Sequence, residues 1–404
     1  MLASVLLFYK EIPPIIIRSS RSAQLFFTLT LILFWMTYGL MFAFAAKFLQ
    51  TLNFSNTLIG LTLGCSYAAS ALLQPLIADF LTKKQIPQIR WIRFTTLINL
   101  TLSLALWLLP GTKGIFVLLM VLMLSLQSAM EPSINSLTQT LSRAGFEVSY
   151  SLGRACSGLS YALMSWGMGL LLLRVSARHI PGFTILGLAG MLALTSLVSV
   201  PEKARIETEL TPEETSSVRS LVFYLLLCGI VCLSFGHTFI DNFMLQIMEH
   251  VGGNSSHLGT ALALAALCEM PAMLLYGHLS KKVSDRSLLL FAAWMWGVRN
   301  LLVLLARNPY MVYGAEIMQF LTYAFYVPAV LNVTRQMLPE EQFLKGLSLT
   351  GSAFTIGSVT ATFVGGPLLD LAGMKPTLIL IFGITLLGAV ILTVQATLTK
   401  KRHS

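Results

Sequence analysis

Residues 201–219 read PEKARIETELTPEETSSVR and form the longest polar stretch in the chain. The stretch contains two prolines, is rich in acidic, Thr and Ser residues, and lies almost at the midpoint of the 404 residues. It separates the apolar runs PGFTILGLAGMLALTSLVSV (181–200) and SLVFYLLLCGIVCLSFGHTFIDNFMLQIM (220–248). Such a composition is typical of a linker between domains. We therefore expect two domains, residues 1–200 and 220–404.

Apolar runs continue on both sides of this linker. Hydrophobic residues make up 55% of the chain and charged residues only 11%, whereas a soluble domain has about 25% charged residues. About 20 apolar residues are needed to cross a bilayer as a helix. The twelve runs that qualify are 24–48, 57–81, 91–109, 114–139, 150–173, 181–200, 220–248, 257–277, 287–306, 310–335, 346–369 and 377–397.

These runs predict the fold class. Only helices and closed barrels satisfy their backbone groups inside lipid, and the ten-residue alternation of barrel strands is absent from the sequence. We predict an all-α membrane protein with 12 transmembrane helices in two pseudo-symmetric six-helix bundles, joined by residues 201–219 as a cytoplasmic linker. Little sequence is left for a large soluble catalytic domain.

The distribution of Lys and Arg predicts the orientation. Of the 27 Lys and Arg, nineteen lie on the N-terminal side of the membrane, and Arg154 and Arg299 lie within spans. Six lie on the opposite side: Lys47, Lys113, Arg174, Arg178, Arg307 and Lys375. Cytoplasmic loops carry such an excess, so we expect a multi-pass protein of the cell membrane with both termini in the cytoplasm. The net charge of +10 is spread among short loops, which favours an orientation signal over nucleic-acid binding.

Two short matches between the halves indicate an internal repeat. LTKK (81–84) recurs as LSKK (279–282), and PSINSLT (132–138) is matched by PAVLNVT (328–334). The two offsets are nearly equal and close to half the chain. Duplicated six-helix halves are typical of transporters that bind solute between the repeats near the middle of the membrane.

Ionisable residues inside the predicted spans are the first candidates for a functional site. A charge in the bilayer is costly unless it is paired or hydrated, so each one is a functional hypothesis. The embedded acids and bases are Glu131, Arg154, Asp241, Glu269, Arg299 and Glu316. His237 lies one turn before Asp241, on the same helix face.

The two halves differ in the balance of these charges. Glu131 and Arg154 can neutralise each other in the first half. The second half has three acids for one base, so two carboxyls must face water, bind a cation or carry a proton. A carboxyl left unpaired in a low dielectric is readily protonated, which is what a proton-coupled carrier needs. Glu269 and Arg299 lie on consecutive spans and can pair, and release from that pair would let Glu269 take a proton.

Structural roles are the alternative for each of these groups. Glu131 with Arg154, and Glu269 with Arg299, can serve only as ion pairs that hold helices together. His237 and Asp241 can form a satisfied polar patch, and Glu316 can be partly solvated near the end of its span.

Three tyrosines lie beside the embedded charges. Tyr161 follows Arg154 by seven residues and therefore shares its helix face. An aromatic ring beside an arginine suits a sugar ring, an aromatic ring or a nucleobase. Tyr323 and Tyr326 lie one turn apart in span 310–335, where they either bind solute or anchor the helix at the membrane interface.

Four stretches carry a family resemblance. They are Gln74-Pro75-Leu76 followed by Lys83-Lys84, residues 152–162 (LGRACSGLSYA), residues 267–271 (LCEMP) with Gly297-Val298-Arg299, and residues 365–370 (GGPLLD). Together they resemble the major facilitator superfamily, and more narrowly its lactose permease-like oligosaccharide/proton symporters and phenylpropionate permease-like carriers. The resemblance covers essentially the whole chain and implies the major facilitator fold.

The resemblance also implies roles for individual residues. Arg154 would contact the solute with Glu131 as its acidic partner, and Tyr161 would replace an aromatic residue that stacks on the sugar. Glu269 and Arg299 would belong to the proton-coupling network.

The sequence departs from the family pattern at two places. The loop after the second span normally has a Gly and an Asp where Ala78 and Thr82 stand here. Lactose-type carriers have a His and a Glu one turn apart in span ten, where this chain offers Tyr323 and Tyr326. Tyrosine titrates at about 10, so coupling would rest on Glu269, Asp241 or Glu316, and lactose itself is not expected as the solute.

We therefore predict a secondary active transporter that works by alternating access as a proton symporter. A saccharide or glycoside is favoured, and a nucleoside or an aromatic acid stays open. The substrate-binding candidates are Glu131, Arg154, Tyr161, Tyr323 and Tyr326, and the proton-coupling candidates are Asp241, Glu269, Arg299, Glu316 and His237. A proton-coupled sugar or drug exporter is one alternative, and a non-transporting membrane sensor or scaffold is another.

An enzyme is not predicted. The sequence offers no nucleophile–base pair, His-rich metal site or nucleotide-binding loop. The five cysteines lie in apolar runs without His or carboxylates at metal-site spacing, so we expect no metal and no other cofactor. The expected partners are a small-molecule solute, the proton and the lipid bilayer, with no nucleic acid, and we expect a monomer.

Overall fold

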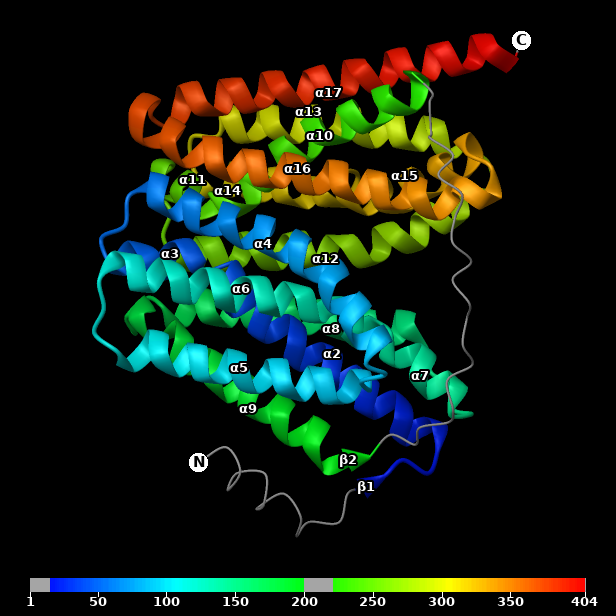
Figure 1. Cartoon of the computed structure of the whole chain (residues 1–404). Helices are drawn as coiled ribbons and strands as arrows, with labels where there is room; N and C mark the ends of the chain where they lie inside the picture. The colour runs from blue at the N-terminus through cyan, green and yellow to red at the C-terminus, as the bar shows by residue number, and fades with distance from the viewer. Residues whose placement is uncertain (1–14, 200–220, 404) are drawn as a thin grey trace. The chain divides into compact units, whose positions relative to one another are not determined.

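The structure of the chain is a computed structural model that describes residues 15–199 and 221–403 (Figure 1). The predicted linker, residues 201–219, lies outside the described residues. Helices dominate the described chain. Two short strands, β1 (Ile15–Ile16) and β2 (Val198–Ser199), pair in parallel.

The helices of the first half cover its apolar runs. They are α2 (Ser20–Phe42), α3 (Ala45–Thr51), α4 (Asn56–Lys83), α5 (Gln88–Leu108), α6 (Lys113–Asn135), α7 (Leu137–Arg143), α8 (Tyr150–Leu171), the 3₁₀ helix η2 (Ala177–His179) and α9 (Ile180–Leu197).

The second half repeats this pattern. Its helices are α10 (Leu221–Asn242), α11 (Met244–His250), α12 (Ser255–Leu279), α13 (Asp285–Leu305), α14 (Pro309–Ile317), the 3₁₀ helix η3 (Met318–Phe320), α15 (Tyr323–Met337), α16 (Glu340–Ala372) and α17 (Met374–His403).

The described residues of all twelve predicted spans are largely helical, and span 181–200 ends in β2. Ten helical segments of the described chain are long and apolar enough to cross a membrane. The two long helices outside that group are α8, with 22 residues, and α12, with 25 residues. Large apolar side chains lie exposed on many helices, among them Leu186, Leu72 and Leu371, which is 86% exposed. Exposed apolar surface of this extent marks the faces that contact lipid in a multi-pass membrane protein.

Several predicted spans are not continuous helices. Span 310–335 is divided into α14, η3 and α15, with a break around Thr322. Short helices also follow longer ones at α3, α7 and α11. A 3₁₀ stretch inside a helix often marks a functional hinge, and transporters place their sites at such breaks. The apolar pattern did not reveal them, because both segments of a broken helix remain apolar.

The chain forms two compact units, and the division between them does not lie at the midpoint of the sequence. The described residues within Met1–Met41, Leu72–Tyr161 and His179–Thr208 form unit 1. Those within Phe42–Ala71, Ala162–Arg178 and Glu209–Ser404 form unit 2. One end of α4 and one end of α8 therefore belong to unit 2. The predicted domains, residues 1–200 and 220–404, stay a proposal.

Each unit has its own apolar core. In unit 1, α5 packs against α6 and α9, and Phe27, Phe34 and Met130 are fully buried. In unit 2, α10 packs against α16 and α17, and α13 packs against α15 and α17. Trp296 and Phe325 lie in that second core, next to the charged residues of unit 2.

Candidate functional site

Arg299 is the centre of a charged cluster in unit 2. Its side chain is 0% exposed. Nη2 donates to both carboxylate oxygens of Glu316, at 2.9 and 3.0 Å, and to Oδ1 of Asp241 at 3.1 Å. Nη1 lies 3.2 Å from Nδ1 of His237. Helices α10, α13 and α14 therefore meet at one guanidinium, whose burial is tolerated because it is paired with carboxylates and hydrogen-bonded.

The contacts of His237 define its tautomer. A guanidinium can only donate, so Nδ1 of His237 accepts from Arg299. The ring proton must then lie on Nε2, which is 3.4 Å from Oδ2 of Asp241. His237 thus acts as a neutral bridge between Arg299 and Asp241.

The cluster holds two carboxylates for one guanidinium. Glu316 is almost fully buried, with 2% of its side chain exposed, whereas 41% of the Asp241 side chain is exposed. One added proton would make the cluster electrically neutral. Asp241 is therefore the exposed carboxyl, and Glu316 is the one enclosed by protein.

Aromatic rings surround this cluster. His237 stacks on Tyr323 with ring centroids 5.0 Å apart and an interplanar angle of 19°. Trp296 lies 5.5 Å from His237 and 5.0 Å from Tyr326, and Phe354 contacts both tyrosines. These apolar rings surround the buried part of the cluster with a low dielectric, which strengthens its electrostatic interactions. The structure therefore brings five of the predicted site residues, His237, Asp241, Arg299, Glu316 and Tyr323, into one group, with Tyr326 beside it.

Glu269 has a different partner from the one considered from sequence. Its Oε1 accepts a hydrogen bond of 3.4 Å from Gln319 of η3, and Oε1 of Gln319 accepts one of 3.3 Å from Thr322. Arg299 directs its ion pairs to Asp241 and Glu316 instead. Glu316 and Gln319 lie three residues apart, next to the break in span 310–335. The segments at this break therefore contact Arg299 through Glu316 and Glu269 through Gln319.

The candidate residues of unit 1 are Arg154, Glu131 and Tyr161. Its guanidinium carbon lies 3.9 Å from the centre of a Trp35 ring, a cation–π contact. Glu131 interacts with the charge of Arg154 and with the side chain of Asn135, but it forms none of the close ion pairs found among the described residues. Tyr161 is partly buried on the same helix as Arg154.

Unsatisfied polar atoms accompany this group. Gln127 is 0% exposed and lies one turn before Glu131 on α6. Its Nε2 donates to Oγ1 of Thr37 at 3.1 Å, while its Oε1 and the Nε1 of Trp35 have no hydrogen-bond partner within the described chain. A buried unpaired donor or acceptor is costly, and functional sites are where such groups persist.

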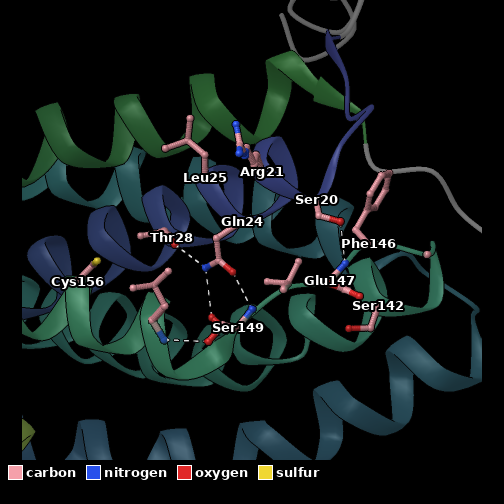
Figure 2. Close-up of a pocket in the computed structure, with 13 residues that line it drawn as sticks. Ser20, Arg21, Gln24, Leu25, Thr28, Ser142, Phe146, Glu147, Ser149 and Cys156 are labelled. Carbon is pink, nitrogen blue, oxygen red and sulfur yellow. Dashed lines mark hydrogen bonds between the residues drawn. The ribbon is translucent and has the colours of Figure 1, made fainter.

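A separate cavity of about 1060 Å³ lies in unit 1, between the first turns of α2 and the start of α8. Figure 2 shows that Gln24 holds the segment before α8: its Oε1 accepts from Ser149 N at 2.7 Å and its Nε2 donates to Ser149 O at 3.2 Å. The serine hydroxyl of Ser20 accepts from Glu147 N at 3.0 Å. These polar groups are already used within the protein, and none of the predicted site residues lines this cavity.

Known proteins resemble this chain in sequence and in fold. Residues 226–404 match the model of the Major Facilitator Superfamily. The maltose permease of Geobacillus stearothermophilus is 25% identical over 357 residues, which cover 85% of this chain and 87% of that protein.

Solved structures extend the likeness to nearly the whole fold. A variant of the nucleoside transporter NupG gives a TM-score of 0.82 with 11% identity, over 92% of this chain and 99% of that chain. A bacterial homolog of the human lysosomal transporter Spinster, in an inward-facing and occupied conformation, gives 0.69 with 15% identity, over 94% and 98%. At these identities the likeness concerns the fold alone.

The fold, the embedded charges and these matches define a membrane transporter rather than an enzyme. The second part of the chain matches the Major Facilitator Superfamily model, and the chain as a whole is similar in sequence or fold to transporters.

Sequence reasoning missed several residues of these groups. Trp35, Gln127 and Gln319 were not among the candidates. The spacing of Gln127 and Glu131, four residues apart and so on one helix face, was a usable signal. Trp35 gave no such signal, because a tryptophan in a span is most often a packing or interface residue.

Proposed function

We propose that this protein carries a small neutral, hydroxyl-rich solute across the cell membrane together with protons, by alternating access. The proposal rests on one observation above all: two carboxylates, Asp241 and Glu316, share the buried guanidinium of Arg299. In this scheme a proton joins the surplus carboxyl on one side of the membrane and leaves on the other.

The arrangement around Arg299 supports a proton rather than a metal cation. A cation site needs several oxygen ligands that are free to coordinate. Both oxygens of Glu316 accept from Arg299, and the oxygens of Asp241 lie next to Arg299 and His237. The exposed face of Asp241 would admit the proton, and Glu316 would hold it away from water.

The residues of unit 1 favour a neutral solute. Glu131 and Arg154 carry opposite charges, so the group offers no net positive charge to an aromatic acid. Trp35 Nε1 and Gln127 Oε1 are a buried donor and a buried acceptor without partners in the described chain, and a conformational change that exposed them would let them bind hydroxyl groups. The sequence similarity to a maltose permease, which extends over 85% of the chain, favours a saccharide or glycoside.

A nucleoside is the second candidate. It is also neutral and hydroxyl-rich, and the fold resembles that of NupG, described as a nucleoside transporter. The partly exposed ring of Tyr323 would stack on a nucleobase as well as on a sugar. Export in exchange for protons would use the same residues, so the direction of transport has to be measured.

Uptake into proteoliposomes tests the proposal. The purified protein is reconstituted with an inward proton gradient and offered labelled maltose and other saccharides, glycosides, nucleosides and aromatic acids, with and without a protonophore. We expect one neutral class to accumulate and the protonophore to abolish accumulation. Accumulation that is unchanged by the protonophore contradicts proton coupling, and accumulation of an aromatic acid alone contradicts the assigned solute class.

A further inference from the structure

A group of hydrogen bonds in unit 2, away from the charged cluster, joins the last turn of α16 to the first turn of α4. Asp370 ends the stretch GGPLLD. Its Oδ1 accepts from Asn56 N at 3.2 Å and from Asn56 Nδ2 at 2.9 Å. Its Oδ2 accepts from Thr57 N at 2.7 Å and from Thr57 Oγ1 at 2.6 Å. Four donors of one helix therefore meet one carboxylate of another.

The position of these donors makes the contact strong. The first N–H groups of a helix have no partner within the helix, and its N-terminus carries a partial positive charge. Helices usually satisfy these groups with a capping residue of their own. Here α4 takes part of its cap from α16, which follows it by some 300 positions in the sequence. Hydrogen bonds to a carboxylate are about twice as strong as those between neutral groups.

Other contacts bring further helices together at this end of unit 2. Gln246 of α11 donates to Oδ1 of Asn56 at 3.1 Å. Glu249 of α11 accepts from Lys47 at 3.2 Å and from Gln50 at 3.0 Å, both on α3. Each contact joins a helix of the first half of the sequence to one of the second.

Glycines permit the close approach of α4 and α16. A Cβ on Gly60 would collide with the carbonyl oxygen of Thr362, and one on Gly366 would collide with that of Asn56. The two backbones are therefore in direct contact next to Asp370, and nothing but hydrogen bonds and packing holds them.

We propose that the carboxylate of Asp370 is a latch that holds α4 and α16 together and stabilises the conformation closed at this end. The latch rests on the proposed transport function, because alternating access requires each end to open in turn. Opening at this end requires Asp370 to release Asn56 and Thr57, which then bind water. By the distribution of Lys and Arg, this end faces the outside of the cell.

A distance measurement on the full-length protein in lipid tests the latch. Nitroxide labels are placed on Cys65, an exposed residue of α4, and on Leu371→Cys, since Leu371 is 86% exposed beside the latch; the other four cysteines are replaced by alanine. We expect a dominant short distance with Asp370 intact. Asp370→Asn should raise the ratio of long to short distances about tenfold, because it weakens charge-assisted hydrogen bonds.

Two further variants make the result specific. Asp79→Asn removes another carboxylate of α4, paired with Lys83 at 2.8 Å, and should leave the distances unchanged. Thr57→Val removes only the hydroxyl bond and should shift the distances in the same direction by less than Asp370→Asn. If Asp370→Asn does not fold, Thr57→Val carries the test.

The outcomes separate the latch from the transport function. A wild-type distance distribution in folded Asp370→Asn, or in Thr57→Val where that variant carries the test, overturns the latch, whatever the uptake of that variant. If the distances shift as expected but the protein transports none of the tested solutes, the latch is supported and the proposed transport function is contradicted.

Discussion

At the scale of single residues, Arg299 of unit 2 and Arg154 of unit 1 have different kinds of partner. Arg299 is held by two carboxylates, whereas Arg154 lies over the ring of Trp35. Carboxylates in an ion pair occupy the N–H groups of a guanidinium. A cation–π contact uses the flat face of the guanidinium and leaves its N–H groups able to donate to a solute. This contrast supports solute binding at Arg154 and proton handling at Arg299.

Replacing Arg154 should remove solute binding. Arg154→Ala deletes the donors that we assign to the solute, and we expect a loss of affinity of tenfold or more, since hydrogen bonds to charged groups contribute about 1.5–3 kcal/mol each. Arg154→Lys keeps the charge but not the planar stacking group and should lie between wild type and Arg154→Ala. Equilibrium binding of the transported solute measures both. An unchanged affinity in Arg154→Ala returns the residue to a structural role.

Replacing Arg299 should destabilise the protein. Arg299→Leu leaves Glu316 buried and uncompensated next to Asp241, and removing one partner of a buried pair costs about 3–5 kcal/mol. Thermal unfolding in detergent should show a clear loss of stability. Adding Glu316→Gln should recover part of it, because the amide carries no charge. If the double variant is as unstable as Arg299→Leu, the charge balance is not the cause.

At the scale of helices, the sequence predicted where the spans lie but not how they meet. The apolar runs are visible because bilayer thickness sets their length. The partner of Arg299 was not visible, because Glu269, Asp241 and Glu316 are equally embedded in sequence. Packing of α13 against α14 and α10 places Glu316 and Asp241 next to Arg299, while Gln319 of η3 contacts Glu269. The break in span 310–335 that positions Gln319 is not visible in the apolar pattern of the sequence.

The close contact of α4 and α16 leads to a stability prediction. Gly366→Ala puts a methyl group against the backbone of Asn56, and overpacking of this kind costs about 1–3 kcal/mol. Gly351 lies on the same helix with nothing within 4 Å of an added Cβ. Gly351→Ala should therefore be neutral or stabilising, since alanine favours a helix over glycine by about 0.5–1 kcal/mol. Equal melting temperatures for the two variants contradict the contact.

Asp285 ties three helices of unit 2 together. It accepts from the hydroxyl of Tyr276 on α12 and from Asn332 and Gln336 on α15, the latter two at 2.9 Å. Asp285→Asn should loosen the ends of α13 and α15, because an amide replaces an acceptor-only carboxylate. Hydrogen exchange of these segments should rise several-fold, and Lys282→Ala, at an exposed neighbouring position, serves as the control. Exchange that is unaltered in Asp285→Asn, or equally raised in the control, speaks against the tie.

At the scale of the whole molecule, composition and charge distribution already predicted a twelve-helix transporter. The similarity to known transporters supports that class, and the resemblance to lactose permease-like carriers implied roles for residues already chosen as candidates. The sequence could not predict the Asp370 contacts, because residues 56 and 370 are brought together only by the tertiary fold. The identity of the solute could not be predicted either, because Glu131, Arg154 and Trp35 suit several neutral, hydroxyl-rich molecules.

The central claim is that the surplus carboxyl of the Arg299 cluster carries the coupled proton. Wild type and Glu316→Gln are reconstituted with a pH-sensitive dye inside the vesicles, and the transported solute is added outside without an imposed gradient. We predict that solute entry acidifies the lumen in wild type, whereas Glu316→Gln still exchanges labelled solute but moves no protons. Acidification by Glu316→Gln at the wild-type rate would contradict the account.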